Sequence, residues 1–151
     1  MAQQTFRQAL TAKLESIPEL TAIVRAAIYP GSLPITHDLL RDGPALSYVV
    51  PSLPRNHHLT GSDGTATARV QLSAWSLEEC VSELLALAIF NAIDGVYNDA
   101  SWGNGTIVVM SCLHDDEEDL PEPPKEGSDD WIYQIASIYV VKHRIVYPTH
   151  T

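Results

Sequence analysis

Residues 65–75 read TATARVQLSAW, and this stretch decides the fold. Apolar and polar side chains alternate along it without a break, as they do on a β-strand whose two faces meet different surroundings. The apolar set is Ala66, Ala68, Val70, Leu72 and Ala74, and the polar set is Thr65, Thr67, Arg69, Gln71 and Ser73. We therefore predict a strand whose first set lies in the core and whose second set faces water or a partner.

Two helices are predicted before this strand. Residues 5–16 repeat apolar side chains at helical spacing, and Thr5 with Gln8 has the pattern of a capping box. A second, shorter helix restarts near Pro18, because proline is tolerated in a first turn, where its missing N–H is not needed. Residues 29–44 then contain proline and glycine repeatedly, so we expect a loop there.

A third helix is predicted directly after the alternating strand, over Ser76–Asp94. Ser76 followed by Glu79 has the capping-box pattern, and Gly95 stands where a left-handed residue commonly ends a helix. The apolar stripe expected to face the core consists of Leu77, Cys80, Val81, Leu84, Leu87 and Ala88. This is the longest helix that the sequence predicts.

Four strands are predicted, in two antiparallel hairpins on either side of the third helix. They cover residues 45–50 with a continuation past Pro51, 65–75, 106–113 and 131–145. Pro51 and Pro54 indicate an edge position or a bulge. We therefore predict one α+β domain over residues 1–151, a four-stranded antiparallel sheet with helices packed on one face, in the order α-α-β-β-α-β-β.

The segment His114–Asp130 joins the last two predicted strands and is strongly acidic. It holds nine of the nineteen acids, with Lys125 as its single base. We expect a solvated hairpin loop, or a loop that orders only in an assembly. Calcium binding is a third interpretation, but the EF-hand pattern is absent. The acids expected to face a lumen or a partner are Asp115, Asp116, Glu117, Glu118 and Asp119.

The net charge limits the classes of partner. Lys plus Arg number 9 and Asp plus Glu number 19, which gives a formal net charge of −10. Nucleic-acid binding gains most of its affinity from Lys and Arg that neutralise phosphates, so we do not expect tight DNA binding. DNA can still slide past an acidic wall. No apolar signal stretch opens the chain, and no run approaches about 18 apolar residues, so we expect a soluble protein without a membrane partner.

No catalytic constellation is visible, and we expect neither enzymatic activity nor a cofactor or metal. Cys80 and Cys112 lack metal spacing; two reduced, buried thiols are favoured over the alternative of a disulfide. His57 and His58 are adjacent, so on a regular strand they point to opposite faces and cannot chelate one ion together. Trp75, Trp102 and Trp131 stand at element boundaries, as residues of a core rim or as interface anchors.

Four motifs follow one another along the chain. They are Ala22-Ile23-Val24 leading to Ile28-Tyr29-Pro30-Gly31, Pro44-Ala45-Leu46-Ser47-Tyr48, Leu59-Thr60-Gly61-Ser62-Asp63-Gly64, and Arg69-Val70-Gln71-Leu72. Together with the helix from Ser76 and the final strand after an aspartate-rich segment, this order resembles the tail-completion, or tail-terminator, proteins of long-tailed bacteriophages. The resemblance covers nearly the whole chain. The segment His114–Asp130 departs from it, being longer and more acidic than the family's.

The resemblance implies a structural protein of the virion tail or neck, assembled in the bacterial cytoplasm. Such proteins form homohexameric rings that cap the finished tail tube, bind the head connector and let DNA pass through the lumen. Six copies would carry 6 × (−10) = −60 formal charges. A ring also needs two different patches on each subunit. The residues expected at an interface with the next subunit or the tube are Leu59, Gly61, Gly64, Arg69 and Gln71.

Three alternatives stay open at this stage. A head-completion or connector ring of the same neck has a similar size. A small metal-dependent enzyme would use His114 with the acids Asp115–Asp119 as ligands. A cytosolic binding module of α+β type, with unknown partners, also fits the composition.

Overall fold

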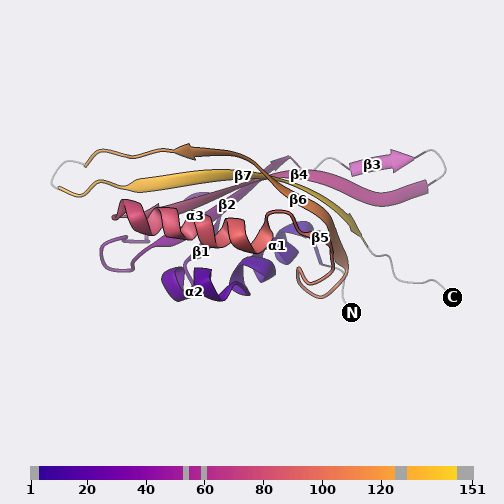
Figure 1. Ribbon diagram of the computed structural model, residues 1–151, viewed down its shortest axis with the longest axis horizontal. Coiled ribbons are helices and arrows are strands. Elements are labelled where there is room, and N and C mark those ends of the chain that lie inside the picture. Colours follow the sequence, from indigo (N-terminus) through magenta and orange to yellow (C-terminus); the bar gives the residue numbers. More distant parts are fainter. Residues whose placement is uncertain (1–3, 53–54, 59–60, 125–128, 146–151) are drawn as a thin grey trace.

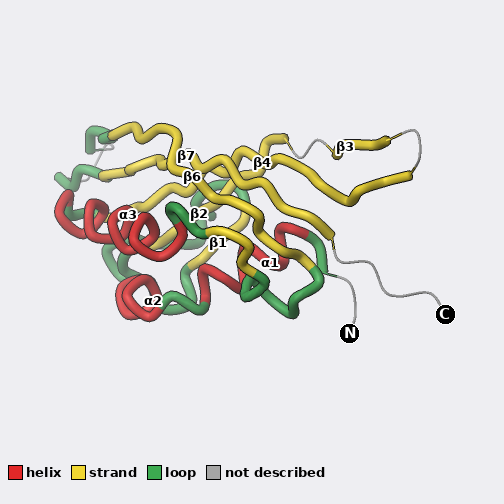
Figure 2. The backbone as a smooth tube through the Cα atoms, turned by 45° about the vertical axis from the view of Figure 1, so that its right-hand side comes forward, coloured by secondary structure: helices red, strands yellow, loops and turns green. Residues whose placement is uncertain are grey.

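The helices and strands form two layers, with all three helices on one face of a long, twisted sheet (Figures 1 and 2). The computed structural model describes residues 4–52, 55–58, 61–124 and 129–145. The elements in chain order are α1 (Phe6–Glu15), α2 (Pro18–Val24), β1 (Ile28–Pro30), β2 (Ala45–Ser52), β3 (Arg55–His58), β4 (Gly61–Ser76), α3 (Glu79–Ile93), β5 (Tyr97–Asp99), β6 (Ile107–Asp119) and β7 (Tyr133–Ile145).

One mixed sheet of seven strands contains every strand of the described residues. Its order is β1-β2-β4-β7-β6-β5, and β3 pairs with β4 beside this path. β1 pairs with β2 in parallel, and the other pairings are antiparallel. The predicted four-stranded antiparallel sheet is therefore wrong. Strands of three or four residues, such as β1, β3 and β5, are too short to show a periodicity, so the sequence did not indicate them.

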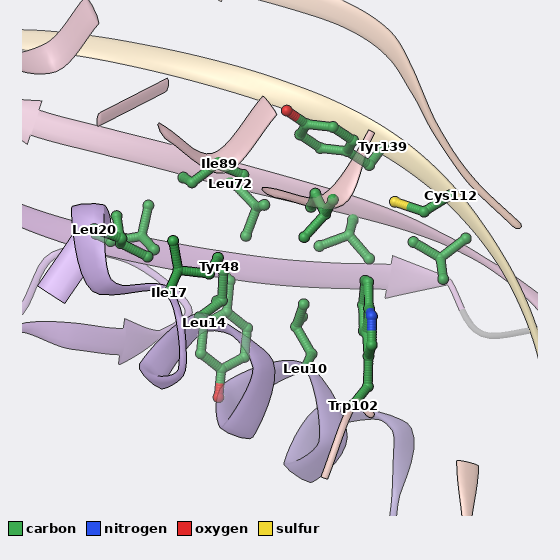
Figure 3. Packing of buried hydrophobic residues seen from close by; sticks show 14 of the residues in the cluster. Leu10, Leu14, Ile17, Leu20, Tyr48, Leu72, Ile89, Trp102, Cys112 and Tyr139 are labelled. Carbon is green, nitrogen blue, oxygen red and sulfur yellow. The ribbon is translucent and has the colours of Figure 1, made fainter. Parts of the chain in front are cut away.

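The alternating stretch forms most of β4, which lies in the middle of the sheet. All five members of its apolar set are buried, as predicted. Ala68, Val70, Leu72 and Ala74 share one core cluster with Leu10 and Leu14 of α1, Leu85 and Ile89 of α3, and Trp102 from the segment between β5 and β6. Figure 3 shows several of these side chains between the helices and the sheet. The core therefore lies between the two layers.

The predicted start of α1 is confirmed by its cap. Thr5 Oγ1 accepts a hydrogen bond from the Gln8 backbone N–H at 3.2 Å, and Gln8 Oε1 accepts one from the Thr5 backbone N–H at 2.9 Å. These two bonds satisfy backbone donors that have no partner inside the helix. The bulge predicted near Pro51 is also present, because the register of β2 against β4 shifts between Val49 and Ser52.

The loop predicted over residues 29–44 begins later than expected. Ile28–Pro30 forms β1, which pairs with Leu46–Tyr48 of β2. Gly31 then takes a φ of +83°, a left-handed conformation that suits glycine, and its N–H donates to the Tyr48 carbonyl at 2.8 Å. The pairing of β1 comes from its neighbour, which a Pro-Gly signal in the sequence cannot reveal.

α3 begins later than predicted, at Glu79 instead of Ser76. Ser76 is the last residue of β4, and its hydroxyl accepts the Glu78 N–H at 3.0 Å. The predicted capping box is therefore wrong. At the other end, Gly95 has a φ of +78°, the left-handed conformation predicted for it.

The predicted apolar stripe of α3 is wrong at three positions, whereas its member Val81 is half-buried and packs against the core. Leu84, Leu87 and Cys80 are exposed. The residues that face the core are Ser82, Leu85, Ala86, Ile89 and Ile93. Apolar residues occupy both sides of α3, so their periodicity did not decide which side is buried.

Candidate functional site: the open sheet face and the acidic strand

The face of the sheet opposite the helices carries the polar set of β4. Arg69 is exposed there, and its Nη2 lies 2.9 Å from Oδ2 of Asp115 in β6. In the sheet, Arg69 pairs with Val140 of β7, and Val140 pairs with Leu113 of β6. The ion pair therefore reaches across β7. The sequence placed Arg69 and Asp115 in separate features, and the structure brings them together.

A short polar network lies farther along β4 on the same face. Ser73 Oγ accepts hydrogen bonds from Gln134 Nε2 at 3.0 Å and from Gln71 Nε2 at 3.4 Å. Trp75 Nε1 donates to Ser47 Oγ in β2 at 2.9 Å. The Ser47 and Ser73 hydroxyls are buried, so these contacts hold the half-buried amide of Gln71 in place on this face of the sheet.

Two further predicted interface residues, Gly61 and Gly64, belong to the part of β4 beside β3. Both glycines are therefore strand residues in this structure. His58 of β3 pairs with Gly61. Leu59 lies outside the described residues. Figure 1 shows that β3 and its partner stretch of β4 extend away from the helices.

The segment predicted as an acidic loop is, in its first part, a regular strand. Asp115–Asp119 belong to β6, where Asp116 pairs with Ile138 and Asp119 pairs with Ile135 of β7. Asp and Glu are depleted in strands, which explains the wrong prediction. Backbone hydrogen bonds to β7 hold the strand, and exposure keeps its carboxylates in water. Alternation along a strand divides these carboxylates between two faces of the sheet.

On the helix side, β6 places His114 and Glu117 against α3. The His114 ring meets Phe90 and Tyr139 edge to face, with ring centroids 5.5 Å and 5.2 Å away. Its Nε2 lies 3.8 Å from Oε1 of Glu117, and this oxygen also accepts the Ser137 hydroxyl at 3.0 Å. The Glu117 carboxylate therefore lies between the His114 ring and the Ser137 hydroxyl.

The two cysteines have different surroundings, and both are free thiols. Cys112 is buried, and burial together with the nearby Asp94 carboxylate raises the pKa of its thiol to about 12. It therefore stays protonated and unreactive near neutral pH. Cys80 is exposed, because it lies on the outer side of α3. The prediction of burial is confirmed for Cys112 and wrong for Cys80.

Tyr139 offers a test of packing beneath α3. It is fully buried, and its hydroxyl has no hydrogen-bond partner among the described residues. Burial, then the nearby Cys112 and Asp94, raise the pKa of this phenol. Tyr139→Phe keeps the ring and removes an unsatisfied polar group, so we expect the free energy of unfolding to rise by about 1–2 kcal/mol. Urea denaturation monitored by circular dichroism measures it.

Tyr48→Phe is the matched control for that substitution. The Tyr48 hydroxyl shares a hydrogen bond of 2.7 Å with Thr11 Oγ1. Removing it should lower the free energy of unfolding by about 0.5–1.5 kcal/mol. If Tyr139→Phe proved as destabilising as Tyr48→Phe, the hydroxyl of Tyr139 would have a partner in solution.

No metal centre is found within the described ranges, where no group of three or more His, Cys, Asp or Glu side chains is placed to hold an ion. The metal-enzyme alternative would need the acids of Asp115–Asp119 close together, but successive residues of a strand such as β6 point to opposite faces of the sheet. His57 and His58 are successive residues of β3, paired with Ser62 and Gly61. In the part of the chain that the structure covers, no helix is long and apolar enough to cross a membrane.

Comparisons with known proteins give a fold and no family. Neither a protein-family model nor a curated protein matches the chain. A chain from the virion of a native gene transfer agent (GTA) particle has a similar structure, with a TM-score of 0.62 over 92% of this chain and 94% of that chain, at 14% sequence identity. At this identity the likeness establishes a shared fold. The fold with helices on one face of a mixed sheet therefore also occurs in a virion chain.

Proposed function

We propose that this chain is a structural protein of a phage-like virion. Its proposed task is to cap the completed tail tube and join it to the head connector, as a homohexameric ring through which DNA passes. The observation that carries the proposal is the shared fold with a virion chain along 92% of the sequence. The ordered motifs that resemble tail-completion proteins support it independently. The proposal assigns no enzymatic step, cofactor or membrane contact to the chain.

The sheet offers the two different patches that a ring requires. β1, β2 and β3 lie toward one edge of the sheet, and β5 and β6 lie toward the other. Strand edges present unpaired backbone N–H and C=O groups that can pair with another chain. The open face with Arg69 and Gln71 lies between these edges. We assign it to the contact with the next subunit or with the tube.

The net charge of the chain supports a ring that lets DNA pass in preference to a protein that binds DNA. Each subunit has a formal net charge of −10, with 19 acids against 9 Lys and Arg. The run Asp115–Asp119 lies on an exposed strand of the ring subunit. Carboxylates repel phosphates, so DNA moving through the lumen would meet few groups able to hold it.

Electron microscopy and native mass spectrometry test the proposal. The full chain is examined alone and after mixing with the tail-tube protein of the same particle. We expect closed rings, either alone or at one end of each tube. A chain that stays monomeric at all concentrations and leaves the tube ends bare would overturn the proposal. Binding to the head connector without binding to tubes would assign it to head completion. Stoichiometric metal in the purified protein would favour the metal-enzyme alternative.

A further inference from the structure

The outer side of α3 is apolar although the described residues leave it uncovered. Leu84, Leu87 and Phe90 are 54%, 52% and 39% exposed. Their spacing of three residues places them along one side of the helix, at about 100° of rotation per residue. A single exposed leucine is ordinary, but a contiguous apolar patch on a helix indicates a contact surface.

A groove runs beside this patch, between α3 and the acidic strand. Its volume is about 400 Å³, and its walls are Glu83, Ala86, Leu87, Phe90, His114, Glu117 and Ile135. The floor is apolar, and the His114 ring is held against Phe90 with centroids 5.5 Å apart. Glu83 lies at one side of the groove on α3, and Glu117 lies at the other on β6. We call the patch and this groove the α3 groove.

The carboxylates of Glu83 and Glu117 line the α3 groove, and no Lys or Arg is among its lining residues. Residues 70–124, which contain both α3 and β6, include no Lys or Arg. The acids of the same span are Glu78, Glu79, Glu83, Asp94, Asp99, Asp115, Asp116, Glu117, Glu118, Asp119 and Glu122. An apolar segment flanked by Lys or Arg fits such a surface, because electrostatic complementarity favours it over neutral or acidic competitors. Phosphate-bearing DNA is disfavoured for the same reason.

A second copy of this chain fits the α3 groove poorly. Its other exposed apolar side chains include Ile35, Leu40, Leu113, Leu120 and Trp131. Ile35 and Leu40 lie in a segment that also holds Asp38 and Asp42, and the one base of that segment, Arg41, is paired with Asp42. Asp115, Asp119 and Asp130 stand within two residues of the other three. Docking any of these onto the groove would bring carboxylates together, which costs affinity. The occupant that fits is therefore a different protein.

We propose that the α3 groove is the docking site for an amphipathic, basic helical segment of a second protein. Two or three apolar side chains of that segment cover Leu84, Leu87 and Phe90, and its flanking Lys or Arg side chains reach Glu83 and Glu117. Recognition of this kind lays the apolar face of a helix into an apolar groove. The site lies on the helix side of the sheet, away from the open face assigned to the ring. Its test is therefore independent of ring assembly.

Cys80 provides a reporter at the site. It is exposed on α3, four residues before Leu84, so about one helical turn separates them on the same side. Cys112 is buried and does not compete for reagents. The probe is a synthetic helical peptide of about 15 residues with a leucine stripe and flanking lysines. Its binding to the full chain should slow the reaction of Cys80 with the uncharged reagent N-ethylmaleimide by about tenfold, measured by mass spectrometry.

Two altered peptides test the stated chemistry. One carries glutamate in place of every lysine, and the other carries serine in place of every leucine. We expect neither to protect Cys80. Protection by the acidic peptide equal to that by the basic one would overturn the charge argument. Protection by the peptide without leucines would show that apolar contacts are not required for binding.

Variants of the chain locate the contact. Leu84→Ser combined with Leu87→Ser should weaken binding of the basic peptide by about tenfold or more, measured by fluorescence anisotropy. Both side chains are more than half exposed, so the fold should survive. Leu113→Ser is the matched control, because Leu113 is 57% exposed on the opposite face of the sheet. It should bind the peptide like the unmodified chain.

Two outcomes would overturn the docking site. Equal binding by the double variant and the unmodified chain would show attraction by net charge alone. Loss of self-association in the double variant, measured by analytical ultracentrifugation, would assign the α3 groove to a second copy. A double variant that still forms rings on tail tubes, yet no longer binds the peptide, would support both proposals separately.

Discussion

Replacing Trp102 by alanine is expected to lower the free energy of unfolding by about 3–5 kcal/mol. Trp102 is 0% exposed and is the largest side chain of the core. Figure 3 shows it beside Leu10 of α1, where it fills the space between α1 and the sheet. A domain is stable by only about 5–15 kcal/mol, so this loss is a large fraction of the total.

The polar edge of Trp102 adds to that cost. Its Nε1 donates to Oδ2 of Asp99 at 3.1 Å, and the Ser101 N–H donates to Oδ1 of Asp99 at 2.8 Å. Burial alone would raise the pKa of Asp99, but hydrogen bonds from Ser101 and Trp102 outweigh it and lower this pKa. The alanine variant would leave the carboxylate with one donor fewer.

Urea denaturation monitored by far-ultraviolet circular dichroism measures the effect of Trp102→Ala. The control is Trp131→Ala, because Trp131 is 46% exposed and its removal opens no buried cavity. The control should cost less than about 1 kcal/mol. Equal losses in the two variants would show that Trp102 does not carry the core contact described above.

Reversing the charge of Arg69 is expected to abolish ring assembly while the subunit stays folded. Arg69→Glu removes the ion pair with Asp115, whose atoms are 2.9 Å apart, and puts two carboxylates in its place. The pair is exposed, so the free energy of unfolding should change by less than about 1 kcal/mol. A ring repeats one interface at every subunit, so a single repulsive contact recurs around the whole assembly.

Native mass spectrometry and electron microscopy with the tail-tube protein measure assembly, and circular dichroism checks the fold. Arg41→Glu is the matched control: Arg41 is also exposed, with Nε 3.6 Å from Oδ1 of Asp42. It lies in the segment between β1 and β2, outside β4 and the strands that pair with it. Rings should form normally in the control. Normal rings in Arg69→Glu would show that this residue is only a surface charge.

The features that the sequence predicted well are local ones. Strict alternation over residues 65–75 placed every member of the apolar set of β4 in the core. The Thr5 and Gln8 pair forms the cap that its spacing indicated. Both depend on residues within one turn or a few positions of the same strand. No distant contact was needed to predict them.

The wrong predictions concern features that depend on contacts with distant segments of the chain. α3 is apolar on both sides, and only the position of the sheet decides that Leu85 and Ile89 are buried and Leu84 is not. The acidic composition of this part of β6 indicated a loop, yet its backbone pairs with β7 and forms a strand. The sequence predicted the candidate site in part. Arg69 and Gln71 were expected to face a partner, but the contact of Arg69 with Asp115 was not predicted.

The sequence by itself determined the long elements, their chain order and the buried face of β4, because periodicity and capping are properties of neighbouring residues. Only the tertiary structure decided that β1 adds a parallel pairing, that β6 continues through Asp119, and that Leu84 and Leu87 face outward. These outcomes depend on hydrogen bonds and apolar burial supplied by segments far away in the chain. A local sequence pattern does not reveal which distant segments will pack against it.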